Sequence, residues 1–486
     1  MGQKLGNLKP ELLWNHFEEI CNVPRPSRKE QKVAQYVISV AKRNNLGYAI
    51  DDFGNVVIRK PATPGKENLT PIVMQGHLDM VAEKNSDVVH DFDKDPIKPF
   101  VDGDWVKATG TTLGSDNGIG VAAALAVLES KEIEHGPIEA LFTLDEETGL
   151  FGAQALKPGF VNAKILINLD SEEDGAFYIG CAGGQSTYLK FRTSLNDVPG
   201  NTTPLEIKIR GLKGGHSGLD INTGRGNAIK IIIRLLHELN YKFGIRLVSL
   251  NGGSKHNAIP RESFAVIRVS NKAVADVSSY IDNYNSLVKS ELAAVEPNLN
   301  ISVKSVKSKA KAIDKLSAKN IIDSIYAVPN GVIKMSADIT GLVETSTNLG
   351  VVVTKGKSVD VTLSQRSSVE SEKIDISNSI AALFKLAKAD VHQADGYPGW
   401  KPDINSPILK TVKNVYDALY HTEPEIKAIH AGLECGIIKE QYPEMDMISF
   451  GPTIVGAHSP DEKVQISTVE NFWNLLVNIL KNIPVN

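Results

Sequence analysis

The first 184 residues alternate helical stripes of apolar side chains with short, continuous apolar runs. Apolar positions spaced i, i+3, i+4, i+7 and i+8 predict an amphipathic helix over residues 33–41, and an Ala-rich stretch predicts another over 118–129. The continuous runs predict strands that are buried on both faces. They occupy residues 55–58, 71–74, 138–142 and 164–167. This alternation favours an α/β domain, with helices on both faces of a mostly parallel sheet.

From residue 185 the pattern changes to strict alternation of apolar and polar positions, which is typical of half-exposed antiparallel strands. A helix is expected between two such strands, and a hairpin is expected around Lys355-Gly356-Lys357. These features predict an α+β region. The expected strands cover residues 205–210, 263–268, 351–353 and 359–363, and the helix covers 227–240.

Helix and strand alternation of the first kind returns after Tyr397-Pro398-Gly399-Trp400. A strand is expected at residues 447–450 and a final amphipathic helix at 469–481. We therefore predict one α/β domain made of residues 1–184 and 400–486. It is interrupted by an inserted α+β domain at residues 185–399.

Composition narrows the class of protein. The 486 residues are 42% hydrophobic and 23% charged with a net charge of −4, so there is no positive excess to attract nucleic acid or an anionic membrane. The apolar stretch around residues 119–128 is far shorter than the ~20 residues that cross a bilayer. Cys21, Cys181 and Cys435 are too far apart for a Cys-x-x-Cys motif. We expect a soluble, cytoplasmic protein with no nucleic-acid or membrane partner.

Histidines and carboxylates follow the ends of the predicted buried strands, where α/β sheets bind ligands. His77 and Asp79 face the same side because strand side chains repeat every two residues, so Asp79 can accept a ring proton from His77. A hydrogen-bonded strand end explains this pair equally well. Asp116 lies between glycines just before a predicted helix, where it could also be an ordinary helix cap.

The same strand-end pattern recurs twice, and a second histidine lies in the carboxy-terminal part of the chain. Asp145-Glu146-Glu147 and Asp170 each follow a buried strand, and His458 lies among Gly456-Ala457-His458-Ser459-Pro460. A solvated acidic turn is the alternative explanation for the three consecutive acids. Taken together, nitrogen and oxygen donors without sulfur suit zinc, cobalt or manganese at a two-metal centre.

These motifs, in this order and spacing, resemble the site of the co-catalytic di-zinc peptidases, a family that includes aminoacylase, carnosinase, tripeptidase and a glutamate-releasing carboxypeptidase. The likeness extends over essentially the whole chain. Further stretches are similar to the bacterial dipeptidases of that family. They are Gly211–Gly218, Asn251–Gly253, His256–Arg261 and His430–Gly436.

The resemblance implies two divalent metal ions per subunit, most simply zinc, with cobalt or manganese as alternatives. His77 and Asp170 would bind one ion, Glu147 and His458 the other, and Asp116 would bridge both. The family pattern also implies a cis peptide bond after Asp116.

The resemblance further implies how the reaction is catalysed. The metals would hold and activate the attacking water, Glu146 would be the general base, and Asp79 would orient His77. Because adjacent side chains of a strand face opposite ways, the strand end must be kinked to bring both Glu146 and Glu147 to the site.

The inserted domain would act as a lid and dimerisation domain. By resemblance, His216 would stabilise the oxyanion across the interface of a homodimer, although a plain loop histidine is the alternative. Asn257 and Arg366 are candidates for the substrate carboxylate, and Gly432 and Glu434 for its free amine. An ordinary surface arginine is an equal interpretation of Arg366.

The function that the resemblance implies is a metallopeptidase that hydrolyses unblocked dipeptides with broad specificity, including those that end in histidine. One alternative keeps the site but acts on N-acyl amino acids or on longer peptides. Another is a non-catalytic metal-binding scaffold. The long insert, about 215 residues by these boundaries, would form a subunit interface or close one end of the pocket.

Overall fold

The computed structural model describes residues 5–485 and divides into two compact units. Unit 1 ends at Cys181 and resumes with Trp400–Ala428 and again from Leu433. Unit 2 comprises Ala182–Gly399 and Ile429–Gly432. The return of residues 429–432 to unit 2 has a local cause, because the Ala182 N–H donates to the carbonyls of Ile429 and Ala431. Sequence patterns gave no sign of this crossing.

Unit 1 is built on a mixed sheet whose strand order is β1-β2-β6-β3-β7-β23-β8-β22. The central strands β6, β3, β7 and β23 are parallel, whereas β1, β2 and β8 pair antiparallel at the sides. The predicted α/β class is confirmed, with the parallel part confined to the centre of the sheet. The strands are β1 (Gly47–Ile50), β2 (Val56–Lys60), β3 (Ile72–His77), β6 (Ile138–Thr143), β7 (Ile165–Asn168), β8 (Ala176–Cys181), β22 (Glu425–Ile429) and β23 (Asp446–Ser449).

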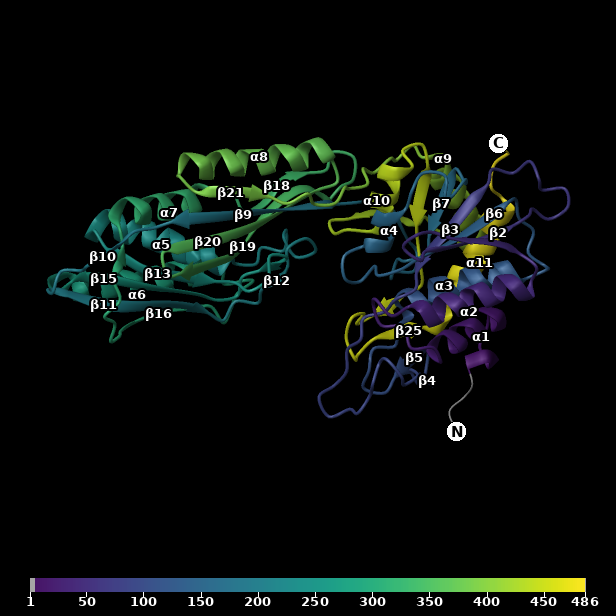
Figure 1. Ribbon diagram of the computed structural model, residues 1–486, viewed down its shortest axis with the longest axis horizontal. Helices are drawn as coiled ribbons and strands as arrows, with labels where there is room; N and C mark the ends of the chain where they lie inside the picture. Colours follow the sequence, from purple (N-terminus) through teal and green to yellow (C-terminus); the bar gives the residue numbers. More distant parts are fainter. Residues whose placement is uncertain (1–4, 486) are drawn as a thin grey trace. The chain divides into compact units, whose positions relative to one another are not determined.

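Helices flank this sheet (Figure 1). Helix α3 is the most deeply buried of them. It packs against α1 and β3 and is apolar on all sides, as a helix without a solvent face must be. The stripe predicted over residues 33–41 is the buried face of α2. The helices are α1 (Glu11–Cys21), α2 (Gln31–Arg43), α3 (Ser115–Glu129), α4 (Phe151–Ala155), α9 (Pro407–Tyr420), α10 (Glu434–Gln441) and α11 (Ile466–Lys481).

A small antiparallel sheet of order β24-β25-β5-β4 completes unit 1. Strands β24 and β25 pair with each other and hold residues 456–462 between them, so this sheet carries His458. The strands are β4 (Pro99–Asp102), β5 (Trp105–Ala108), β24 (Ile454–Val455) and β25 (Lys463–Gln465).

Unit 2 is an antiparallel sheet of order β16-β11-β15-β13-β19-β20-β9-β21, with β18 paired to β19. The predicted hairpin is present as β19 and β20, although both strands are longer than the pattern indicated. Helix α5 packs against the sheet and against α6 and α7, and α8 packs along β9, β20 and β21 (Figure 1). The strands are β9 (Gly183–Arg192), β11 (Thr202–Arg210), β13 (Arg246–Gly252), β15 (Ser263–Ser270), β16 (Asn300–Ser305), β18 (Gly331–Met335), β19 (Val343–Lys355), β20 (Ser358–Ser367) and β21 (Asp390–Gln393).

Two short strand pairs and the helices complete unit 2. The pair β12–β14 carries His216 and aligns it with Ala258. The remaining elements are β10 (Leu195–Asn196), β12 (Gly215–His216), β14 (Ala258–Ile259), β17 (Ala312–Ile313), α5 (Ala228–Phe243), α6 (Val274–Glu291), α7 (Lys315–Ala327) and α8 (Glu370–Leu386).

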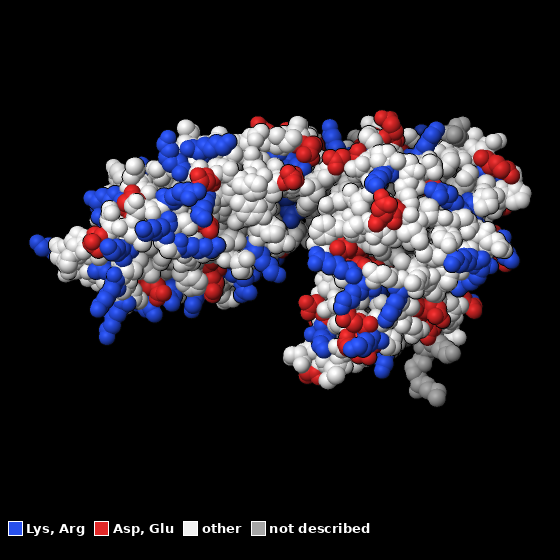
Figure 2. All heavy atoms as spheres, in the orientation of Figure 1, with Lys and Arg blue, Asp and Glu red and all other residues white. Residues whose placement is uncertain are grey.

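The surface carries both signs of charge. Figure 2 shows lysine and arginine side chains mixed with aspartate and glutamate over the visible face of each unit. Within residues 5–485, no helix combines the length and apolar character that a membrane crossing requires.

Candidate functional site

The parallel strands of unit 1 bring the predicted metal ligands together. Strands β3, β6 and β7 run side by side in the same direction, so the residues at their carboxyl ends meet at one edge of the sheet. His77 is the last residue of β3, Glu147 follows β6, and Asp170 follows β7. The start of α3 adds Asp116, and the segment between β24 and β25 adds His458.

The first ligand group surrounds the buried ring of His77. Its Nε2 atom lies 3.1 Å from Oδ1 of Asp116 and 3.4 Å from Oδ1 of Asp170. On the opposite side of the ring, Nδ1 lies 3.3 Å from Oδ1 of Asp79. One ring nitrogen thus faces two carboxylates while the other is oriented by a third, which is the arrangement of a metal-ligating histidine and its supporting carboxylate.

The second ligand group lies on the other side of Asp116. Nε2 of His458 is 3.1 Å from Oδ2 of Asp116 and 3.0 Å from Oε2 of Glu147. Asp116 therefore turns one oxygen toward His77 and the other toward His458. The buried Oε1 atom of Glu147 has no hydrogen-bond partner among the described residues. Both groups have the donor types and spacing to hold a divalent cation.

A backbone kink brings both Glu146 and Glu147 to this edge. Strand β6 ends at Thr143, and Asp145 adopts a left-handed conformation with φ of 52°. The following N–H groups of Glu146 and Glu147 then donate to the two oxygens of Asp79, at 3.0 and 3.1 Å. Asp79 consequently positions His77 and both glutamates. Desolvation in the site raises the pKa of Glu146 well above its usual value. The Asp116–Asn117 peptide bond is cis.

Unit 2 contains a buried arginine that has only neutral partners. Arg366 is 7% exposed and donates to Oη of Tyr397 at 2.9 Å and to Oγ of Ser217 at 3.4 Å. Within residues 5–485 it has no carboxylate partner. A guanidinium that is buried in this way costs free energy unless an anion joins it. The geometry therefore suits a negatively charged ligand group.

His216 adds a second donor beside Arg366. Its Nδ1 atom accepts hydrogen bonds from the N–H groups of Gly218 and Leu219, at 3.2 and 3.1 Å, so the proton of the neutral ring is on Nε2. That Nε2 lies 3.4 Å from Nη2 of Arg366. Burial, followed by the charge of Arg366, lowers the pKa of His216 to about 4. Two donors thus converge without an acceptor between them.

Asn257 and Gly432 lie in the same unit as Arg366 and His216. The carbonyl of Asn257 accepts the N–H of Ser217 at 2.9 Å, which joins the Asn257 loop to the His216 loop. A Cβ atom at Gly432 would lie 2.9 Å from the ring of Tyr397. The backbone of Gly432 therefore lies against the Tyr397 ring.

Glu434 belongs to unit 1 and begins α10. It is 1% exposed, and its Oε2 atom accepts from Nε2 of Gln75 at 2.6 Å and from Oγ1 of Thr143 at 2.8 Å. Its buried Oε1 atom has no partner among residues 5–485. Burial raises the pKa of Glu434 to about 7. The Oε1 atom of Glu434 can therefore accept hydrogen bonds from a bound molecule.

Some residues near these groups gave no signal in the sequence. Tyr397 lies in a Pro-Gly turn that the sequence marks only as a boundary. His430, whose Nε2 lies 2.7 Å from Oγ of Ser346, belongs to the stretch His430–Gly436, in which only Gly432 and Glu434 have an expected role. Burial, with a smaller contribution from Arg366, lowers the pKa of His430 to about 3. Long-range packing places these residues, so no local spacing could reveal them.

The sequence of the chain matches a known protein family. Residues 73–482 match the profile of Peptidase family M20/M25/M40. The chain belongs to this family. The family resemblance that the motifs indicated is therefore confirmed, and membership in this metallopeptidase family implies divalent metal ions.

Two known dipeptidases are similar to this chain over nearly their whole length. The cytosol non-specific dipeptidase of Escherichia coli (strain K12) is 46% identical over 481 residues, which cover 99% of each chain. The crystal structure of aminoacylhistidine dipeptidase from Vibrio alginolyticus is 44% identical, with a TM-score of 0.94 over 100% of this chain and 99% of that one. Aminopeptidase PepT from Bacillus cereus, at 17% identity and a TM-score of 0.58, covers 98% of this chain and 99% of its own and shares the fold.

Proposed function

We propose that this chain is a metal-dependent dipeptidase that hydrolyses the peptide bond of unblocked dipeptides with broad specificity, including dipeptides that end in histidine. The observation that carries the proposal is the position of Asp116, with one carboxylate oxygen toward His77 and the other toward His458. The names of the Escherichia coli and Vibrio relatives support the substrate class.

The residues of unit 1 fit two divalent cations. His77, Asp116 and Asp170 would hold one, and Asp116, Glu147 and His458 the other. The four carboxylates Asp116, Glu146, Glu147 and Asp170 match the four positive charges of two such ions. The Oε1 atom of Glu147, which has no hydrogen-bond partner within residues 5–485, is free to bind a metal ion. We propose zinc, with cobalt or manganese as substitutes. When bound, these ions lower the pKa of water and polarise the scissile carbonyl.

Three side chains would perform the proton and charge chemistry. Glu146 takes the proton of the attacking water and returns it to the leaving amine, work that typically contributes about 10²–10⁴-fold. Asp79 keeps His77 and Glu146 in place through the contacts described above. His216 donates its Nε2 proton to the oxyanion, and its lowered pKa keeps the ring neutral and the tautomer fixed.

Two buried charges provide complementary groups for the ends of an unblocked dipeptide. Arg366, with Asn257, would bind the carboxylate through the planar guanidinium. Glu434, with Gly432, would bind the free amine, because its Oε1 is buried without a partner. An N-acyl amino acid lacks that amine, so Glu434 favours dipeptidase activity over deacylation.

We also propose a cytosolic homodimer in which His216 acts in the site of the other subunit. His216 belongs to unit 2, whereas the metal ligands belong to unit 1. The cytosolic setting is supported by the name of the Escherichia coli relative and by three buried cysteines that form no disulfide.

The test is metal removal and reconstitution with a substrate panel. Chelated protein should lose hydrolysis of β-alanyl-histidine and alanyl-alanine and regain it with zinc, cobalt or manganese. N-acetyl-alanine and trialanine should be cleaved much more slowly. Faster hydrolysis of N-acetyl-alanine would instead support a deacylase, and metal binding without any hydrolysis would support a scaffold.

A pair of variants tests the role of Glu146. Glu146→Gln should lower kcat by about 10²–10⁴-fold while the protein still binds two metal ions. Glu132→Gln is the control because Glu132 is exposed and its side chain makes no hydrogen bond or ion pair within residues 5–485. Full activity of Glu146→Gln would exclude the general base.

A further inference from the structure

Glu462 makes an unusual set of contacts close to the metal ligands. It lies in the segment between β24 and β25, four residues after His458, and is 2% exposed. Its Oε2 accepts the N–H groups of Leu113 and Gly114 at 2.7 and 2.9 Å. Its Oε1 accepts the N–H and Oγ–H of Ser115 at 2.7 and 2.6 Å and the N–H of Asp116 at 3.3 Å. One carboxylate therefore binds four successive N–H groups of the loop that delivers Asp116.

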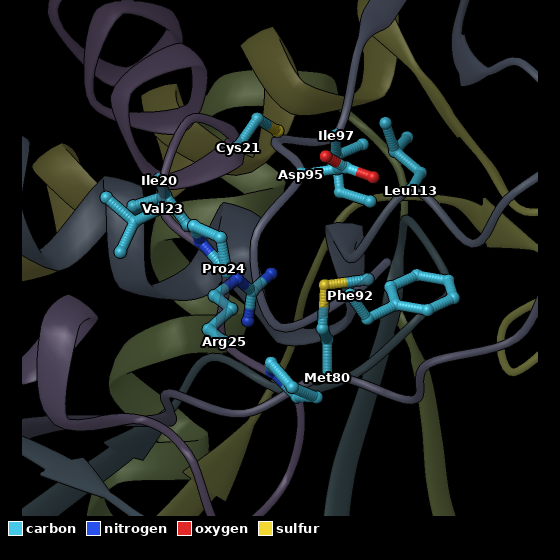
Figure 3. A pocket seen from close by; sticks show the side chains of 11 residues that line it. Ile20, Cys21, Val23, Pro24, Arg25, Met80, Phe92, Asp95, Ile97 and Leu113 are labelled. Carbon is cyan, nitrogen blue, oxygen red and sulfur yellow. The ribbon is translucent and has the colours of Figure 1, made fainter. Parts of the chain in front are cut away.

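Arg25 holds the same loop from its other side. The guanidinium is buried, and its Nη1 donates to the carbonyls of Leu78 and Asp79 at 2.9 and 2.7 Å. Its Nη2 donates to the carbonyl of Gly114. Figure 3 shows Arg25 beside Met80. Both side chains line a small cavity of about 10 Å³. Arg25 thus joins the end of β3, which carries His77, to the Asp116 loop.

Two glycines of the Asp116 motif make room for this arginine. A Cβ atom at Gly114, where φ is +72°, would lie 2.6 Å from Nη2 of Arg25, and one at Gly118 would lie 2.8 Å from the same atom. Such distances are shorter than any ordinary contact, so these positions require glycine as long as Arg25 keeps its place. The motif therefore contains the ligand Asp116 and also the two glycines that leave room for Arg25.

We propose that Glu462 and Arg25 are positioning residues, which hold the three ligand-bearing segments of His77, Asp116 and His458 in the geometry that two cations need. The proposal rests on the metal centre proposed above. Its physical basis is preorganisation, because carboxylate ligands repel one another until the metal binds and must be fixed by groups outside the ligand set. Buried charges can do this when all their hydrogen bonds are satisfied, because those bonds offset the desolvation cost and rigidify the network.

Glu462→Gln in the full-length protein tests the proposal. Glutamine keeps the size of the side chain but presents an amide NH₂ to N–H groups that require an acceptor. The matched control is Glu139→Gln. Glu139 is also buried, accepts the N–H groups of Asn162 and Ala163 at 2.7 and 2.9 Å, and pairs with Arg59. It lies near the beginning of β6, whereas the ligands follow the end of that strand.

The measurement is the affinity of the metal-free protein for cobalt, by competition with a chelator, together with the visible spectrum of the bound ion. Glu462→Gln should weaken cobalt binding by about 10- to 100-fold and alter the spectrum. Glu139→Gln should bind cobalt within about 2-fold of wild type even if its melting temperature falls equally. A merely structural role of Glu462 would not produce that difference.

The outcomes separate this inference from the proposed function. Wild-type protein that binds no cobalt would overturn the metal centre itself. Wild-type binding with Glu462→Gln within 2-fold of it, or an equal loss in Glu139→Gln, would overturn only the positioning role. If Glu462→Gln does not fold, Ser115→Ala tests the positioning role instead, because it removes only the hydroxyl group that donates to Glu462. Its cobalt affinity should fall by about 2- to 10-fold, and unchanged affinity would overturn the proposal.

Discussion

Replacing Arg366 by alanine should remove recognition of the substrate carboxylate. Arg366 is buried and donates only to neutral oxygens, from Tyr397 and Ser217. Its Nη2 faces Nε2 of His216, which is itself a donor. A carboxylate is the group that satisfies the guanidinium. The change should therefore act on substrates that carry a carboxylate and spare those that do not.

The magnitude follows from the hydrogen bonds that a carboxylate would gain. A hydrogen bond to a charged group contributes about 1.5–3 kcal/mol, and a forked guanidinium supplies two. The loss of about 3–6 kcal/mol corresponds to a fall of about 10²–10⁴-fold in kcat/KM. A dipeptide amide has no carboxylate to lose, so its kcat/KM should change less than about tenfold.

The assay compares kcat/KM of alanyl-alanine with that of alanyl-alanine amide in wild type and Arg366→Ala. Arg268→Ala is the matched control, because Arg268 also lies in unit 2 and donates only to neutral oxygens, from Thr202 and Ser308. It should leave both substrates within about 2-fold of wild type. Equal losses for the acid and the amide in Arg366→Ala would refute the reasoning.

Stability gives an independent check on Arg366. Removal of one member of a buried ion pair typically destabilises a protein by about 3–5 kcal/mol. Arg366 has no counter-ion within residues 5–485, so Arg366→Ala should change the free energy of unfolding by no more than about 1 kcal/mol. A loss of several kcal/mol would show that the guanidinium has a structural role.

Three further predictions concern other groups. Glu434→Gln keeps the size of the side chain but removes its charge. The kcat/KM for free dipeptides should fall about tenfold or more, while the slow hydrolysis of N-acetylated dipeptides should not fall. Gly114→Ala should lower the free energy of unfolding by about 2–4 kcal/mol, since it combines left-handed φ with a clash against Arg25. Gly356→Ala, at φ of +57° with nothing within 4 Å, should lose only about 1–2 kcal/mol. His430→Gln should reduce the loss of stability on acidification from pH 7.5 to 5 by about 2 kcal/mol.

The sign of the His430 effect follows from its pKa in the two states. The folded pKa of about 3 lies below the ordinary value of 6.5, so the unfolded chain takes up the proton first as the pH falls. The stabilisation is therefore complete above pH 6.5 and is lost between pH 6.5 and 3. Denaturant unfolding at the two pH values measures it, and an unchanged pH dependence in His430→Gln would contradict the prediction.

The other two predictions have their own contrary results. For Glu434→Gln, it is an equal fall in kcat/KM for free and N-acetylated dipeptides. For Gly114→Ala, it is a loss of unfolding free energy no larger than that of Gly356→Ala.

The sequence alone determined the features that depend on neighbouring residues. Strands β3, β6 and β7 and helix α3 were predicted because burial on both faces leaves a continuous apolar run, which is a local signal. The strand ends then pointed to His77 and Asp170 as candidate ligands. The family motifs supplied the rest of the expected site.

Only the tertiary structure decided how distant residues support that site. Glu462 binds the Asp116 loop across 346 positions of sequence, and Gln75 binds Glu434 across 359. The neighbours of Arg366 are all neutral because the end of β20 lies beside the Tyr397 turn and the His216 loop. Such contacts follow from how whole elements pack, and no periodicity along the chain records them. The sequence therefore determined which residues could do chemistry, while packing decided which buried charges are satisfied and which remain for the substrate.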